Sequence, residues 1–187
     1  MRLAGVVLAG AILAACGSTS PEAPQLNTTV RDVRAGQVVD SVPCLTADLA
    51  EHHMHVHLAI YSDGVEVKVP AGIGVGRPWG FDNTGFLATG SCFARLHTHD
   101  TSGVIHIATP ALTLFTLGQL FEVWGQPLAS DGSFNYKGVL TVLVDGRHSD
   151  GDPRNITLTP FENIVLELGK PPAVPPASIY DFSSLNR

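Results

Sequence analysis

The stretch "EHHMHVHLAIYSDG", residues 51–64, decides the fold because apolar and polar side chains alternate along it. A period of two is typical of a β-strand, whose successive side chains point to opposite faces of a sheet. Asp63 and Gly64 then supply the positive φ angles of a tight hairpin turn, and "VEVKVPAG" forms the returning strand. One face carries Met54, Val56, Leu58 and Ile60, and the other carries His53, His55, His57, Ala59 and Tyr61.

A second histidine-rich stretch is "LHTHDTSGVIH", residues 96–106, which reads as two short strands joined at Asp100 to Gly103. His97 and His99 share one parity, and His106 lies opposite its apolar neighbours. Adjacent strands lie about 4.8 Å apart and residues i and i+2 about 6.5–7 Å apart, so imidazoles on neighbouring strands come near enough to share a metal ion. The predicted ligands are His55, His57, His97, His99 and His106, with His53 in reserve. His52 and His148 are expected to be solvated surface side chains.

The ligand chemistry favours copper first and zinc second. All the clustered donors are nitrogens, and Met54, the one thioether nearby, falls on the apolar side of its strand. Imidazole suits Cu(II) and Zn(II), and copper generally binds such sites more tightly. Because ligating imidazoles must be neutral and an unperturbed histidine titrates near 6.5, binding is expected to weaken below about pH 6.

Two other classes of function fit the same residues. In an enzyme, the metal would keep an open position for water or O₂, with Glu51 or Asp100 as the base. A shell of three imidazoles plus solvent would favour catalysis, and a closed shell of four would favour storage. In a metal-free binding module, the histidine face would line a pocket for a ligand or protein. The Gly-rich segment 72–91 would then be its lid, with contacts from Trp79, Phe81 and Phe86.

The N-terminus reads as an export signal. Residues 1–15 carry one arginine and then small and apolar residues, too few to span a bilayer. Leu13 to Cys16 resembles a lipobox, after which Cys16 would be acylated; an ordinary secretory cleavage site is the alternative. Residues 16–40, rich in Ser, Thr and Pro at first, are expected to tether the domain flexibly to the extracytoplasmic side of a membrane, as in the periplasm.

The net charge limits the possible binding partners, and the cysteines predict a disulfide. A net charge of −6 disfavours electrostatic binding to nucleic acid or to an anionic membrane surface. The expected partners are the membrane, through the lipid on Cys16, and a protein that donates or accepts the metal. In an oxidising compartment, Cys44 and Cys92 are expected to form a disulfide. Two free thiols, or a thiolate pair that binds a metal, are the alternatives.

One helix is expected at about 117–124. Thr116 and Gln119 form a capping box, and Gly125 and Pro127 end the helix. Its apolar stripe, expected to face the core, comprises Leu117, Leu120, Phe121 and Trp124. Further strands are expected within 138–146 and 155–169. The fold class is therefore mostly β, sandwich or barrel-like or α+β, with a single domain at 41–170 and a Pro-rich extended tail at 171–187.

Four segments together resemble a largely uncharacterised family of small exported bacterial and archaeal proteins. The segments are "HMHVHLAIYSDG", "VPAGIGV", "LHTHDTSGVIHIATP" and "FTLGQLFEVWGQPL", in that order. The resemblance covers about residues 44–170. It implies that the histidine stretches, the Gly-rich segment and the helix belong to one domain type, and it carries no assigned activity. "GVIHIE" is common in that family, whereas Ala108 stands here, so a carboxylate role does not transfer to this position.

Overall fold

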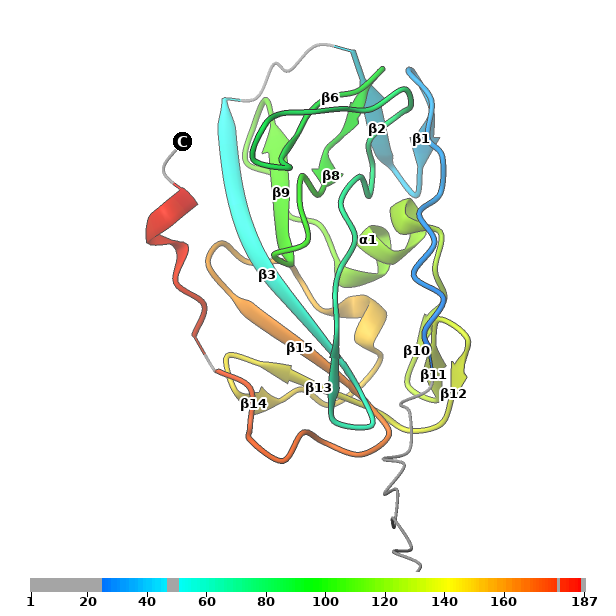
Figure 1. The fold of residues 1–187 in the computed structure, drawn as a ribbon, viewed down its shortest axis with the longest axis vertical. Helices are drawn as coiled ribbons and strands as arrows, with labels where there is room; N and C mark the ends of the chain where they lie inside the picture. Colours follow the sequence, from blue (N-terminus) through cyan, green and yellow to red (C-terminus); the bar gives the residue numbers. More distant parts are fainter. Residues whose placement is uncertain (1–24, 47–50, 178, 186–187) are drawn as a thin grey trace, which may run out of the picture.

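In a computed structural model, the described part of the protein is mostly β and contains a single α-helix (Figure 1). The structure describes residues 25–46, 51–177 and 179–185. This confirms the expected fold class. Within the described residues, no helix is long and apolar enough to cross a membrane.

The main sheet is built around the long strand β3. Its strands, in spatial order, are β14 (Arg147–His148), β13 (Leu140–Val144), β15 (Asn163–Leu168), β3 (His52–Ser62), β9 (Val104–Thr109) and β8 (Leu96–His97), with β4 (Val65–Val67) also paired to β3. β15 runs parallel to β3, and the other pairs are antiparallel. The hairpin from β3 to β4 turns at Asp63 and Gly64, with φ of 47° and 83°, as the sequence predicts.

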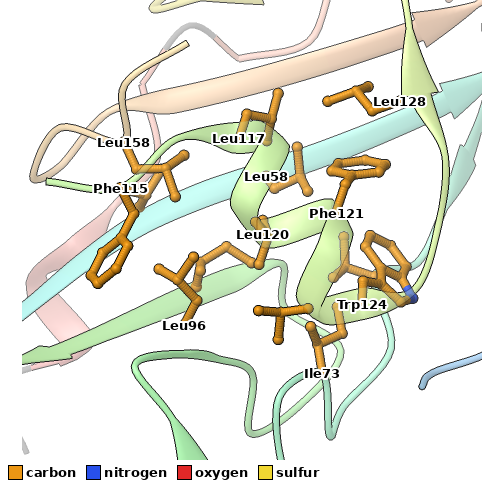
Figure 2. Packing of buried hydrophobic residues seen from close by; sticks show 14 of the residues in the cluster. Leu58, Ile73, Leu96, Phe115, Leu117, Leu120, Phe121, Trp124, Leu128 and Leu158 are labelled. Carbon is orange, nitrogen blue, oxygen red and sulfur yellow. The ribbon is translucent and has the colours of Figure 1, made fainter. Parts of the chain in front are cut away.

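The alternation along β3 separates the two faces of this sheet. Val56, Leu58 and Ile60 are at most 1% exposed and belong to the hydrophobic core. The helix α1 (Leu117–Trp124) packs its buried side chains into the same core, against Leu58 and Leu96 (Figure 2). The opposite face of the sheet carries the imidazoles. One strand thus supplies both the core and the histidine face.

The helix begins and ends where the sequence predicts. The Thr116 side chain accepts a hydrogen bond from the Gln119 backbone, and the Gln119 side chain accepts one from the Thr116 backbone. Gly125 ends the helix in the left-handed conformation, with φ of 84°. Both caps satisfy backbone groups that have no partner inside the helix.

Smaller sheets flank the main one. β1 (Val38–Val39), β2 (Val42–Leu45) and β7 (Phe93–Ala94) form one; β10 (Leu128–Ala129), β11 (Gly132–Ser133) and β12 (Tyr136–Lys137) form another; β5 (Gly80–Phe81) pairs with β6 (Leu87–Thr89). The predicted disulfide joins Cys44 of β2 to Cys92, just before β7, with Cα atoms 5.5 Å apart. It therefore anchors the segment that leads into the second histidine stretch.

Both ends of the described chain contact the domain. Residues 25–40, expected to form part of the tether, instead lie on the folded domain: Val33 is 2% exposed, and Trp124 Nε1 donates to the Thr28 carbonyl. A short 3₁₀ turn at Pro153–Asn155 precedes β15. After β15, the C-terminal segment runs beside β3 (red in Figure 1) and includes a second 3₁₀ turn at Phe182–Leu185. There Asn163 Nδ2 donates to the Ala177 carbonyl.

Candidate metal centre

The strand register brings three histidines from three strands into one row. His55 of β3 is directly opposite His106 of β9, and His106 is directly opposite His97 of β8. Side chains directly opposite one another in antiparallel strands share a face and lie about 5 Å apart at Cβ. His53 extends the cluster along β3, and His99 extends it just beyond the end of β8.

The described residues of this cluster form two overlapping sets that could each hold a metal ion. The inner triad is His97, His99 and His106, and the outer triad is His53, His55 and His106. Within each triad, one ligand nitrogen per residue lies within 4.8 Å of the others. His106 belongs to both.

Backbone carbonyls orient two rings of the inner triad. His97 Nδ1 lies 2.8 Å from the Ala94 carbonyl oxygen, and His99 Nδ1 lies 2.6 Å from the Leu87 carbonyl oxygen. A carbonyl oxygen only accepts, so each Nδ1 carries the hydrogen. In the neutral ring, the Nε2 atom is then left with a lone pair and no hydrogen.

Those two Nε2 atoms face each other at 3.1 Å. Two lone pairs at this distance repel unless a cation lies beside both of them. Metal–nitrogen bonds of about 2.0–2.1 Å with angles of about 90–110° place two ligand nitrogens about 2.8–3.4 Å apart. The separation of His97 and His99 therefore matches shared coordination, and the carbonyls are the kind of outer partner that fixes a ligand histidine's tautomer.

The outer triad is less constrained. His53 Nε2 lies 3.0 Å from His106 Nδ1, and the His55 ring contacts the rings of both at centroid distances of 4.8 and 4.6 Å. His53 is exposed and His55 is partly buried. In the described part of the chain, no backbone carbonyl accepts a hydrogen bond from either ring.

Burial lowers the pKa of four imidazoles of the cluster. Desolvation, followed by the neighbouring His99, lowers the pKa of His97 to about 3. Desolvation, followed by His53 and His99, lowers the pKa of His55 to about 4. Desolvation likewise lowers the pKa of His99 and of His106, and the other imidazoles lower that of His106 further. The lowered pKa values favour the neutral, metal-binding form of these four rings, so we expect binding to persist to lower pH than it would with unperturbed histidines.

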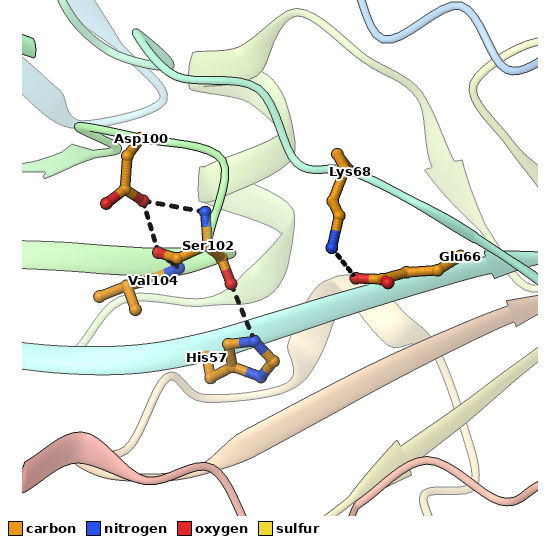
Figure 3. Close-up of polar contacts among 6 residues, drawn as sticks. All are labelled: His57, Glu66, Lys68, Asp100, Ser102 and Val104. Carbon is orange, nitrogen blue, oxygen red and sulfur yellow. Dashed lines mark hydrogen bonds and ion pairs between the residues drawn. The ribbon is translucent and has the colours of Figure 1, made fainter. Parts of the chain in front are cut away.

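His57, a predicted ligand, does not join either triad. Its Nδ1 lies 2.6 Å from Asn163 Oδ1, and its Nε2 lies 3.1 Å from the Ser102 carbonyl oxygen (Figure 3). Its ring also stacks on Tyr180 at a centroid distance of 4.0 Å. Both ring nitrogens thus lie against oxygen atoms outside the cluster, so neither is directed at a metal ion held by the triads. His53, the predicted reserve ligand, takes its place in the outer triad.

The two carboxylates considered as bases lie elsewhere. Asp100 Oδ1 accepts hydrogen bonds from the Ser102 backbone nitrogen and hydroxyl, so this carboxylate stabilises the turn between β8 and β9 (Figure 3). Glu51 is exposed and lies immediately before β3. Neither is among the described residues that line the cavity beside the cluster. His52 and His148 are exposed, as expected.

The Gly-rich segment contains the short β5–β6 pair and supports the inner triad. Phe86 stacks on His99 at a centroid distance of 4.2 Å, next to the Leu87 carbonyl that orients the same ring. Trp79 packs within the segment itself: its Nε1 donates to the Val75 carbonyl, and a Cβ atom on Gly72 would lie 2.4 Å from its ring.

A cavity of about 260 Å³ opens beside the cluster. Its lining includes His53, His97 and His99, together with Phe93 and Arg95. No sequence motif points to Phe93 or Arg95 as part of the site. Their position beside the histidines results from the turn between β7 and β8, and the local sequence does not predict that turn.

Comparison of the chain with protein-family models, with curated proteins and with solved structures finds no match. The fold and the site therefore define the class of protein by themselves. It is a β-rich, disulfide-bonded domain whose sheet presents five clustered imidazoles on the face opposite its core.

Proposed function

We propose that this protein binds a transition metal, copper first and zinc second, in the histidine cluster, and that it buffers the metal or passes it to a partner protein outside the cytoplasm. The observation that carries this proposal is the pair of hydrogen-free Nε2 atoms of His97 and His99, 3.1 Å apart. Burial opposes protonation of these rings, so a proton is a poor substitute for a metal ion between them.

Copper is preferred because the donors are nitrogens. Met54 packs against the hydrophobic core, so its thioether does not contribute a soft ligand for Cu(I). Among divalent ions, Cu(II) binds imidazole sites more tightly than Zn(II) in the usual order of affinities. The two triads offer enough nitrogens for either ion.

Metal exchange is favoured at the outer triad. His53 is exposed, whereas His97 is 5% exposed and His106 is 8% exposed. An ion that passes to or from a partner therefore meets His53 first. A site whose ligands were all buried would retain its ion more firmly.

The proposed location is the extracytoplasmic face of a membrane, with Cys16 acylated. Cys16 and the signal peptide at 1–15 lie outside the described residues. The disulfide supports this proposal because such bonds persist in oxidising compartments. Replacing Cys16 by serine would move the protein from the membrane fraction to the soluble fraction of the cell envelope; an unchanged distribution would contradict acylation.

The function is tested by elemental analysis of untagged protein purified after export. Wild type is expected to carry stoichiometric copper, or zinc when copper is withheld, and His97→Ala is expected to lose it. His57→Ala is the matched control, because that ring lies on β3 but bonds to Asn163 and Ser102. Wild-type protein that stays metal-free after both ions are offered would overturn the proposal.

A further inference from the structure

We infer that the cavity beside the cluster binds a small anion with an oxygen donor, whose charge pairs with Arg95 and whose oxygen completes the coordination of the ion held by His97 and His99. The inference rests on the proposed function, since the ion is part of the binding site. It adds a ligand class that metal buffering does not require.

The first support is the place of the cavity. Its lining includes His97 and His99, whose bare Nε2 atoms define the candidate metal position, and also His53 of the outer triad. A ligand in this space would meet an ion on the inner triad from the cavity side. The volume of about 260 Å³ suits a molecule of a few heavy atoms rather than a cofactor.

The second support is the charge of the lining. Arg95 is the one charged side chain among the described lining residues, and none of those residues is acidic. Its Nη1 donates to the Ala108 carbonyl at 2.9 Å, which holds the guanidinium against the cavity wall. No carboxylate forms an ion pair with it among the described residues. A guanidinium has five N–H donors, so donors remain for an anion.

The third support is the apolar part of the wall. Phe93 contacts the His97 and His99 rings at centroid distances of 5.3 and 5.6 Å. Other apolar lining residues are Leu45, Ala88, Ala94 and Ala108. A cavity lined by apolar side chains and one cation suits an organic carboxylate better than a hydrated inorganic ion, although both share the oxygen donor.

The test uses full-length exported protein loaded with Cu(II), with copper content measured first. Benzoate and acetate form one titration arm, and inorganic phosphate forms the other. The readout is the copper d–d absorption and the EPR spectrum. We expect a saturable spectral shift with benzoate, and about tenfold weaker binding in Arg95→Gln, because a charge-assisted pair is lost. Tighter binding of phosphate than of benzoate would assign the site to inorganic anions.

Two further variants test whether the anion binds in the cavity or responds only to the net charge of the protein. Arg147→Gln removes the same charge from an exposed position on β14 and is expected to leave binding within about twofold of wild type. Ala88→Trp would obstruct the exposed edge of the cavity without removing a candidate ligand, and is expected to abolish the shift at unchanged copper content.

The outcomes distinguish the two proposals. Stoichiometric copper with no spectral response to any anion, or equal binding by wild type and Arg95→Gln, would overturn the anion site and leave metal binding intact. Protein that takes up no metal would overturn the proposed function. It would also remove the proposed bond between the anion and the ion. Calorimetry of the metal-free protein with benzoate would then test only the pairing of the anion with Arg95, and absence of binding there would overturn that pairing as well.

Discussion

The inner and outer triads use the same kind of ligand but differ in what holds it. In the inner triad, backbone carbonyls of Ala94 and Leu87 fix the tautomers of His97 and His99, and Phe86 stacks on one of these rings. In the outer triad, His53 is exposed, and its described ring contacts are with other imidazoles. Rings that are oriented before the ion arrives cost less to organise, so we expect the inner triad to set the affinity and the outer triad to set access.

The largest effect is expected for His106→Ala, because His106 belongs to both triads. Removing it leaves two imidazoles in each set. The affinity for Cu(II), measured by competition with a chelator, is expected to fall at least about a hundredfold, beyond the loss typical of an outer-shell partner. Near-wild-type affinity in this variant would remove the basis for treating the triads as one centre.

The next effect separates the triads. His97→Ala is expected to weaken Cu(II) binding about tenfold more than His55→Ala, since His97 is oriented by a carbonyl and 5% exposed, while His55 is partly buried. The same competition assay applies to both variants, with circular dichroism to verify folding. Equal losses would contradict a larger contribution of the inner triad to Cu(II) affinity. A larger loss for His55→Ala would show that the outer triad contributes more.

The pH dependence follows from the lowered pKa values. The folded rings stay neutral until the pH nears about 4 at His55 and about 3 at His97, so the Cu(II) affinity of the folded protein is expected to change little between pH 7 and 5. In the metal-free protein, the histidines of the unfolded chain become protonated below about pH 6.5, whereas the buried rings of the folded protein stay neutral.

The free energy of unfolding of the metal-free protein should therefore fall with decreasing pH. The slope is expected to be about 1.4 kcal/mol per pH unit for each buried histidine between about pH 6 and 4. Urea titrations at pH 7, 6 and 5 measure it, and His97→Ala should give a shallower slope. A stability that does not change from pH 7 to 5 would contradict burial of the cluster.

The smallest effect on metal binding is expected for His57→Ala. Its ring nitrogens face Asn163 Oδ1 and the Ser102 carbonyl, so copper affinity should remain within about twofold of wild type. The free energy of unfolding should fall by about 1–2 kcal/mol through lost hydrogen bonds and ring stacking. A large loss of copper would show that His57 turns from Asn163 toward the ion.

Much of the fold could be predicted because its signals are local. The period of two along β3 gave a strand with one apolar face, and Asp63 with Gly64 gave the hairpin. The helix bounds followed from the cap residues Thr116 and Gly125. The disulfide could be predicted from the number of cysteines and the expected compartment. Each of these inferences uses residues close in sequence or a small set of options.

The site was predicted in part. Four of the five predicted ligands lie in the triads. Parity placed the imidazoles of each strand away from its apolar residues, and the strand register then aligned His55, His106 and His97. Parity could not separate His57 from His53, since both have the same parity as His55. What separated them was the neighbour on the other side of β3: His57 lies directly opposite Asn163 of β15, nearly at the far end of the chain.

By itself, the sequence determined which side chains share a face, where the helix begins and ends, and that the donors are nitrogens. These properties depend on backbone periodicity and on the chemistry of each residue. Only the tertiary structure decided which imidazoles meet, which tautomers they take and what lies beside them. The tautomers depend on the carbonyls of Ala94 and Leu87, and the surroundings of the site depend on Arg95 at the cavity. Strand order and register bring these groups to the histidines.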